Sequence, residues 1–210
     1  MILHFLAPED KTSWRPIWDK CFNSWGKYKD NIKLWNDDEI IDYLVKDDKK
    51  FYQMYLSKLP FIYSLDYVRY LILRDYNGLY IDLDIELKVD FIPMLKPNNL
   101  YIMEGSLGEY VTNALMGGQL KDTKIWNIIA NDSKYQIIHN IKDCSANVIY
   151  TLENVGPMFL SRWFSLNREW LNINNINFQL LGASAFNKPT SDVYFCKHHH
   201  TNSWVPPVPN

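Results

Sequence analysis

The segment 60–87 constrains the fold more than any other part of the 210-residue chain. Its first part, 60–78, repeats apolar side chains at helical spacing and ends in Asn77-Gly78, a pair that accepts the left-handed backbone found at helix ends. Its second part, 79–87, alternates apolar and polar residues with the period of a strand. A helix that runs almost without a loop into a strand predicts a sheet covered by helices.

The N-terminal residues extend this pattern. Residues 2–6 and 31–35 are short apolar runs typical of strands. Between them, Trp14, Trp18 and Trp25 recur at helical spacing, which predicts an amphipathic helix with these rings in the core. Asp37 can cap a further helix. A strand, helix, strand, helix order indicates an α/β fold with a parallel or mixed sheet.

The C-terminal half is less clearly patterned. We expect strands at 100–103, 114–116 and 193–196 and helices at 125–130 and 157–166, whereas 170–190 is Asn-rich and weakly patterned. No internal repeat is present, so we expect a single domain over 1–204. Residues 205–210 then form a proline-rich tail or the start of a linker, and the chain can be part of a longer multidomain protein.

Composition excludes several classes of function. Lys and Arg number 22 against 24 Asp and Glu, so the chain lacks the basic excess with which proteins bind nucleic acid or anionic membranes. No apolar run reaches the ~20 residues of a membrane span, and the N-terminus lacks a secretion signal. Cys21, Cys144 and Cys196 lie far apart, as free thiols do in a reducing compartment. We expect a soluble protein in the cytoplasm of the producing or a host cell.

The strand at 79–87 carries the first candidate site. Strand alternation puts Tyr80, Asp82, Asp84 and Glu86 on one face. Stacked carboxylates repel one another unless a cation lies between them, and oxygen ligands of this kind suit Mg²⁺ and Mn²⁺. The alternative is the solvated face of an antiparallel sheet.

Two further groups of residues add to this site. Asp66 and Arg69 lie one helical turn apart, where Arg69 can bind a phosphate and Asp66 a ribose or sugar hydroxyl. The alternative for this pair is a surface ion pair of little energetic value. Near the C-terminus, His198 and His200 face the same way if their segment is extended. An imidazole among carboxylates favours Mn²⁺ over Mg²⁺.

These residues carry a family resemblance. The run Ser64-Leu-Asp66-Tyr-Val-Arg69-Tyr70, followed by Asn77-Gly-Leu-Tyr80-Ile-Asp82-Leu-Asp84, resembles the core of glycosyltransferase family 32, the sugar-binding region containing the Asp-x-Asp motif. The glucosylating domains of the large clostridial toxins are similar at the same spacing. Weaker pieces agree in order along the chain: Ile2-Leu-His4, Trp35-Asn-Asp37, Asn113-Ala, Gly156-Pro157 and the histidine run with Ser203-Trp204.

The chain also departs from that pattern at three points. Leu65 replaces a serine, and Asn77 replaces the first glycine of a pair. No tryptophan follows His4-Phe5, which leaves open what stacks on the base of a nucleotide.

The resemblance implies a GT-A fold, that is, a Rossmann-like, mixed and mostly parallel sheet flanked by helices. It also implies a metal-dependent, retaining glycosyltransferase. Such an enzyme moves a hexose from a nucleotide-diphosphate sugar, with UDP as the expected carrier, to a glycan or glycoprotein acceptor. Mn²⁺, or else Mg²⁺, is the expected cofactor.

The resemblance also assigns roles to individual residues. Asp82 and Asp84 would be catalytic and would ligate the metal together with His198, with His200 as the alternative. The residues expected to bind the donor are Asp66, Arg69, Tyr80, Leu83, Asn113, Ser203 and Trp204.

Other functions can use the same residues. A metal-dependent nucleotide phosphohydrolase would need these carboxylates and a histidine. A catalytically silent sugar- or nucleotide-binding module would use the aromatic residues, which make up 15% of the chain. A glycosidase fits poorly, because Asp82 and Asp84 on one strand face would share one environment, whereas an acid and a base need different pKa values.

Overall fold

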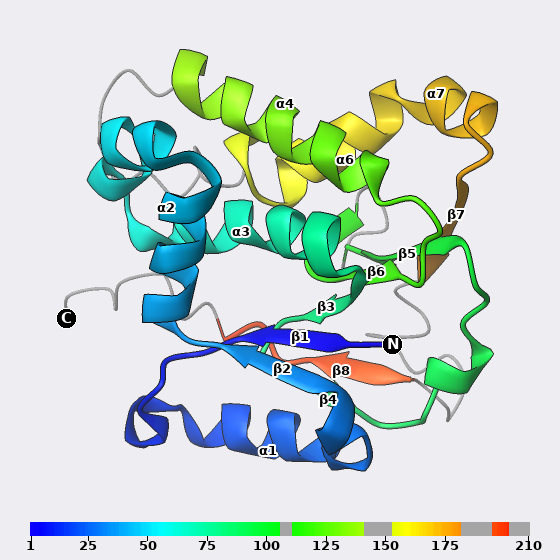
Figure 1. The fold of residues 1–210 in the computed structure, drawn as a ribbon. Coiled ribbons are helices and arrows are strands. Elements are labelled where there is room, and N and C mark those ends of the chain that lie inside the picture. Colours follow the sequence, from blue (N-terminus) through cyan, green and yellow to red (C-terminus); the bar gives the residue numbers. More distant parts are fainter. Residues whose placement is uncertain (106–110, 141–152, 182–194, 202–210) are drawn as a thin grey trace, which may run out of the picture.

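The computed structural model describes residues 1–105, 111–140, 153–181 and 195–201. Ser203, Trp204, Cys144 and the expected tail at 205–210 lie outside these ranges. A six-stranded sheet lies between two helical layers (Figure 1). Its strands are β1 (Leu3–Leu6), β2 (Ile32–Trp35), β3 (Gly78–Ile81), β5 (Asn99–Glu104), β6 (Val111–Gly118) and β7 (Asn177–Leu181).

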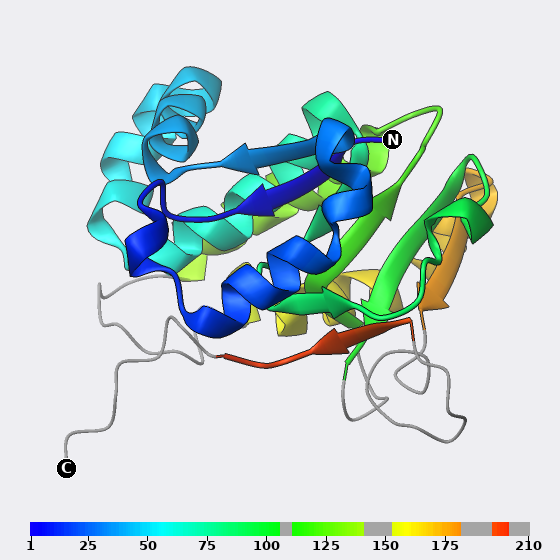
Figure 2. The same ribbon diagram turned by 90° about the horizontal axis from the view of Figure 1, so that it is seen from below.

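The sheet is mixed and mostly parallel, as expected. The strand order is β2-β1-β3-β6-β5-β7, and β6 alone among these strands runs antiparallel to its neighbours. One face is covered by α1 (Pro16–Ser24), and Figure 2 shows this helix lying across the strands. The opposite layer consists of α2 (Asp37–Met54), α3 (Phe61–Tyr76), α4 (Lys124–Asn140), α6 (Pro157–Leu166) and α7 (Arg168–Ile173).

Helix α3 is the central element of the thicker layer. Ten of the eleven residues from Tyr63 to Leu73 are buried between the sheet and helices α2 and α4. The helix ends at Asn77, whose φ of 56° is the left-handed conformation predicted for the Asn-Gly pair. Strand β3 follows at once, so α3 and the end of β3 are held in a fixed relation to each other.

The predicted continuous strand over 79–87 is wrong. The backbone turns after Ile81, where the Ile85 N–H donates to the Asp82 carbonyl (3.0 Å), and Ile85–Leu87 forms a separate strand, β4. Strand β4 leaves the main sheet and pairs antiparallel with β8 (Cys196–His198), as Figure 2 shows. Period-two alternation fixes side-chain directions only while the backbone stays extended, so Asp82 and Asp84 do not share a strand face.

The weakly patterned stretch 170–190 contains elements that the sequence does not predict. Helix α7 ends at Ile173, and β7 runs from Asn177 to Leu181. Strand β7 lies at the edge of the sheet with most of its residues only partly buried, which explains its weak apolar pattern. Of the strand predicted at 193–196, residues 193 and 194 lie outside the described ranges, and the described strand runs from Cys196 to His198.

Smaller expectations are met or corrected locally. The helix at 157–166 is confirmed. Asn36, not Asp37, caps α2, in a reciprocal capping box with Glu39. Cys21 and Cys196 are buried free thiols. Of the helices in the described ranges, none combines the length and apolar character needed to cross a bilayer.

Gly117 lets β3 and β6 approach closely, and we expect its replacement by alanine to destabilise the protein by ~1–3 kcal/mol. Its φ is +130°, and a Cβ atom would lie 2.2 Å from the Gly78 carbonyl oxygen. Urea unfolding of Gly117→Ala measures the loss. Gly26→Ala is the matched control, because a Cβ there meets nothing within 4 Å; equal destabilisation by both variants would contradict the prediction.

Candidate functional site

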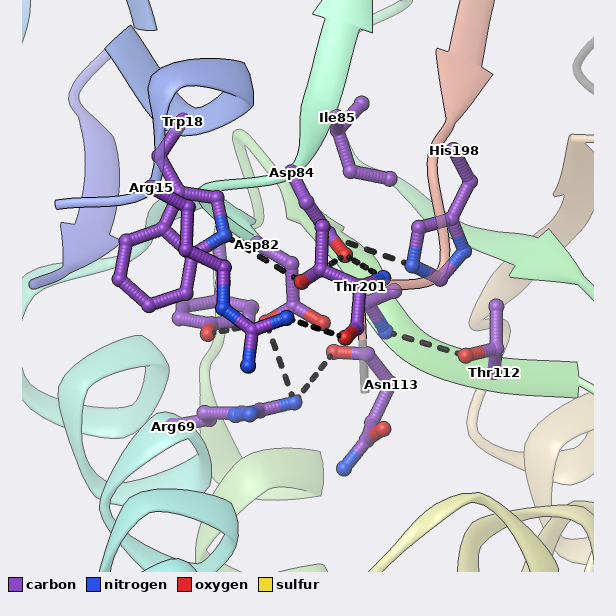
Figure 3. Close-up of polar contacts among 12 residues, drawn as sticks. Arg15, Trp18, Arg69, Asp82, Asp84, Ile85, Thr112, Asn113, His198 and Thr201 are labelled. Carbon is purple, nitrogen blue, oxygen red and sulfur yellow. Dashed lines mark hydrogen bonds and ion pairs between the residues drawn. The ribbon is translucent and has the colours of Figure 1, made fainter. Parts of the chain in front are cut away.

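The candidate site lies where β3 ends and the chain turns into β4. Strands β1 and β3 are parallel, so their carboxyl ends meet at this edge, which is where open α/β sheets place their ligands. Asp82 follows β3 directly, and Asp84 lies in the turn to β4. Figure 3 shows the two aspartates facing His198 of β8 and Arg69 of α3.

Asp84 is buried and is held by the segment that carries β8. His198 Nε2 lies 3.3 Å from Oδ1 of Asp84. The other oxygen, Oδ2, accepts the Thr201 backbone N–H at 2.8 Å and the Thr201 hydroxyl at 2.9 Å. Burial by itself raises the pKa of Asp84, but the contacts with His198 and Thr201 outweigh burial and lower this pKa. Asp84 is therefore held in its ionised form.

In the part of the chain that the structure describes, Asp82 is engaged through one oxygen only. Its Oδ1 accepts the Tyr80 hydroxyl at 2.6 Å and lies 3.3 Å from Nη1 of Arg69. Burial raises the pKa of Asp82 to about 6, although the positive charge of Arg69 opposes this shift. The contacts leave Oδ2 of Asp82 available to a ligand.

Asp82, Asp84 and His198 form a group that can hold a metal ion. Each offers one ligand atom, and these atoms lie within 4.8 Å of one another. Nδ1 of His198 is buried and has no hydrogen-bond partner among the described residues. Carboxylate and imidazole donors with an unsatisfied buried nitrogen fit a divalent cation of the Mg²⁺ or Mn²⁺ class.

Two residues predicted near the metal lie elsewhere. His200 is outside this group; its φ is 47°, and its ring packs on that of His198 with centroids 3.8 Å apart. Glu86 was expected on the same face as the aspartates, but the turn directs it away, to Lys20 (3.2 Å), Lys88 (2.5 Å) and His199 (2.9 Å). The expected stack of three carboxylates is therefore wrong, because the strand that would carry it is broken.

Arg69 and Asp66 form a buried network and not a surface ion pair. Nη1 of Arg69 lies 3.2 Å from Oδ1 of Asp66 and donates to the Asn113 carbonyl at 3.4 Å. The side-chain amide of Asn113 donates to the same Asp66 oxygen at 3.0 Å. The guanidinium lies over the Tyr80 ring, 4.9 Å from its centroid. The helix, β3 and β6 thus bring together four of the predicted donor-binding residues.

Arg69 retains hydrogen-bonding capacity despite these contacts. Its Nε is buried and lacks a partner among the described residues. A buried donor without a partner costs free energy, which a bound anion would recover. Leu83, another predicted donor-binding residue, packs its side chain in the core beside α1, so it can meet a donor through its backbone alone.

Three residues of the site were not predicted to belong to it. Trp18 packs against the apolar core as a half-buried residue, and its indole N–H also donates to the Thr201 hydroxyl at 3.2 Å. Nη1 of Arg15 donates to the Thr201 carbonyl at 2.7 Å. No sequence pattern links Thr201 to the start of α1, which lies more than 180 positions earlier.

The family described as "glycosyltransferase sugar-binding region containing DXD motif" matches residues 16–103, which include Arg69, Asp82 and Asp84. The match covers 88 of the 210 residues. The prediction that the protein is a glycosyltransferase is thereby confirmed. Comparison with curated proteins finds no significant match.

A solved glycosyltransferase structure shares the fold. The PaToxG glycosyltransferase superposes with a TM-score of 0.51 at 15% identity, covering 82% of this chain and 73% of that one, which confirms the GT-A expectation. A glycosyltransferase involved in the glycosylation of the major capsid of PBCV-1 gives a TM-score of 0.47 at 9% sequence identity, and the match covers 97% of this chain and 95% of that one. The UDP-bound glycosyltransferase domain of the YGT toxin gives a TM-score of 0.45 at 11% sequence identity. The match covers 74% of this chain and 53% of that domain, so this chain spans about half of its length.

Arg69 lies between the buried Asp66 and the partly buried Asp82, and we expect Arg69→Met to destabilise the protein by about 3–5 kcal/mol, because the two carboxylates would be left without their shared cation. Arg69→Lys keeps the positive charge, so we expect it to lower the stability of the protein less than Arg69→Met does. Arg74→Met is the matched control: Arg74 lies on the same helix and pairs with Asp47 and Asp75, but it is more exposed, so a loss of about 1 kcal/mol or less is expected. Chemical unfolding compares the three variants, and equal losses for Arg69→Met and Arg74→Met would refute this account.

Proposed function

We propose that this glycosyltransferase is metal-dependent and retaining, and that it transfers a hexose from a nucleotide-diphosphate sugar to a glycan or glycoprotein acceptor. The observation that carries the proposal is the position of Asp82, Asp84 and His198 beside the buried Arg69, which still has an unpartnered donor. A cation site next to a guanidinium suits a diphosphate, which needs positive charge on both sides. UDP is proposed as the carrier because the sequence motif resembles that of UDP-sugar users.

Asp82, Asp84 and His198 would hold the cation, through the oxygens and the nitrogen described above. When bound, such a cation stabilises the negative charge that develops on a leaving diphosphate. Arg69 adds a fixed positive charge whose position is set by Asp66 and Asn113. This charge is in place before the donor arrives, so no reorganisation is needed during the reaction.

The donor sugar is proposed to lie near Asn113 and Asp66. Both are buried and hydrogen-bonded to each other, so their remaining acceptor and donor positions are fixed in direction. Tyr80 packs beneath the Arg69 guanidinium and is tied to Asp82 through its hydroxyl. These contacts orient a donor without taking part in bond breaking.

The retaining outcome is proposed to arise by front-face attack. Asp66, Asp82 and Asp84 are each engaged by hydrogen bonds or by a charged partner, so none stands out as a covalent nucleophile. In this reaction the acceptor oxygen bonds to the anomeric carbon on the face from which the diphosphate departs. The acceptor proton moves to an oxygen of the leaving diphosphate.

Thermal-shift measurements with UDP- and GDP-sugars, each with and without Mn²⁺, test the proposal. At a hundredfold excess over Kd, the correct donor is expected to raise the melting temperature by ~5–10 °C, and only when Mn²⁺ is present. Binding that persists in EDTA would favour a silent sugar-binding module. Release of phosphate from the nucleotide without an acceptor would favour a hydrolase.

Asp84→Asn is expected to reduce that Mn²⁺-dependent shift to less than ~2 °C and to abolish transfer, because it removes one charged metal ligand. Asp90→Asn is the matched control, since Asp90 lies just beyond β4 and pairs with Lys27 and Tyr28 away from the site. An Asp84→Asn protein that binds UDP with Mn²⁺ as tightly as the wild type would exclude Asp84 as a ligand.

A further inference from the structure

Thr201 occupies one side of the Asp84 carboxylate completely. A carboxylate oxygen has two lone-pair positions in its plane. On Oδ2 of Asp84, one accepts the Thr201 backbone N–H (2.8 Å) and the other accepts the Thr201 hydroxyl (2.9 Å). Oδ1, which faces His198, is the oxygen that remains for a cation.

The Thr201 hydroxyl is itself fixed by α1. Its oxygen accepts the indole N–H of Trp18 at 3.2 Å, so its own proton is directed toward Asp84. The Thr201 carbonyl accepts Nη1 of Arg15 at 2.7 Å, and the Arg15 guanidinium lies 5.7 Å from the centre of the Trp18 ring. Figure 3 shows Arg15 and Trp18 on the side of Asp84 away from His198, with Thr201 next to the Asp84 carboxylate. Arg15, which precedes α1, and Trp18 within the helix therefore hold the carbonyl and the hydroxyl of Thr201 in place.

Asp82 is restricted in the same way. Its Oδ1 meets the Tyr80 hydroxyl and Arg69, and no residue within the described ranges contacts Oδ2 through a hydrogen bond or ion pair. Among the described residues, Asp82 thus keeps one oxygen without a partner, and Asp84 keeps one oxygen whose contact is His198, a residue of the same candidate metal group. A pair of carboxylates limited to one oxygen each suits a small cation with six ligands in strict geometry.

Building on the metal site of the proposed function, we propose that Thr201 is a positioning residue that restricts Asp84 to one ligating oxygen and so selects Mn²⁺ and Mg²⁺ against Ca²⁺. Ca²⁺ takes six to eight oxygen ligands and commonly binds a carboxylate through both oxygens. With Oδ2 closed by Thr201, Asp84 cannot bind in that manner. Trp18 supports the same selection by orienting the Thr201 hydroxyl.

The test is calorimetric titration of the full chain with MnCl₂ and with CaCl₂, for the wild type, Thr201→Val and Thr201→Ser. Valine keeps the shape and the backbone N–H but loses the hydroxyl, which frees one lone pair on Oδ2. We expect Thr201→Val to weaken Mn²⁺ binding and to move the ratio of Mn²⁺ to Ca²⁺ affinity toward Ca²⁺ by ~10-fold or more. Thr201→Ser restores the hydroxyl and is expected to restore the ratio.

Thr12→Val is the matched control. Thr12 donates through its backbone N–H and its hydroxyl to Asp10, the same arrangement at a carboxylate outside the site, so its loss is expected to leave both affinities unchanged. Trp18→Phe is expected to change the ratio in the same direction as Thr201→Val, but less.

Three results overturn the proposal, and they are distinguishable. If Thr201→Val keeps the wild-type ratio of affinities while binding Mn²⁺, the role of Thr201 is refuted and the metal site stands. If the wild-type protein binds neither cation, the metal dependence in the proposed function fails together with the role of Thr201. Thermal unfolding in EDTA checks that each variant is folded; a Thr201→Ser protein that is folded but has the altered ratio of the valine variant would also refute the role of the hydroxyl.

Discussion

The pairing of β4 with β8 is the contact on which the candidate site depends. It joins Ile85–Leu87 to Cys196–His198, and Thr201 reaches Asp84 across 117 positions of sequence. Closing a loop of that length costs chain entropy, and the hydrogen bonds of the small sheet do not offset this cost by themselves. The buried residues around it, Ile85 and Cys196 among them, belong to the apolar cluster shared with α1. Burial of apolar surface therefore stabilises the arrangement that brings a histidine to the two aspartates.

Buried charge is tolerated in this site because each charged group has partners from several elements. Arg69 comes from α3, Asp82 from the end of β3, and Asn113 from β6. Asp84 draws its hydrogen bonds from the C-terminal segment. Removing a single partner would leave a charge in surroundings that solvate it poorly, which lowers the stability of the folded protein. The contacts of the site therefore also stabilise the fold around it. The same low-dielectric surroundings strengthen any interaction with a bound anion.

The sequence predicts the fold best where one pattern dominates. The apolar spacing of 60–78 and the Asn77-Gly78 pair predict α3 almost to the residue, and 157–166 is predicted as it is found. Prediction fails where a distant segment decides the local structure: 79–87 has the alternation of one strand, yet it divides because β8 supplies a second partner for its latter half. For the site, the motif identifies Asp66, Arg69, Asp82 and Asp84, but the contacts of Trp18 and Thr201 arise from tertiary packing that no spacing encodes. The choice between His198 and His200 likewise depends on a backbone φ of 47° at His200.

The small sheet of β4 and β8 also has a consequence for the order in which the protein is made. Residues 16–103, with both aspartates of the motif, leave the ribosome well before the segment 195–201 that carries His198 and Thr201. Domains generally fold as they emerge from the N-terminus, so the half-site with two carboxylates precedes the complete one during synthesis. Nascent chains halted before position 195 would then contain the motif without its histidine. The chemistry that the complete site supports becomes available only after residue 201 has been synthesised.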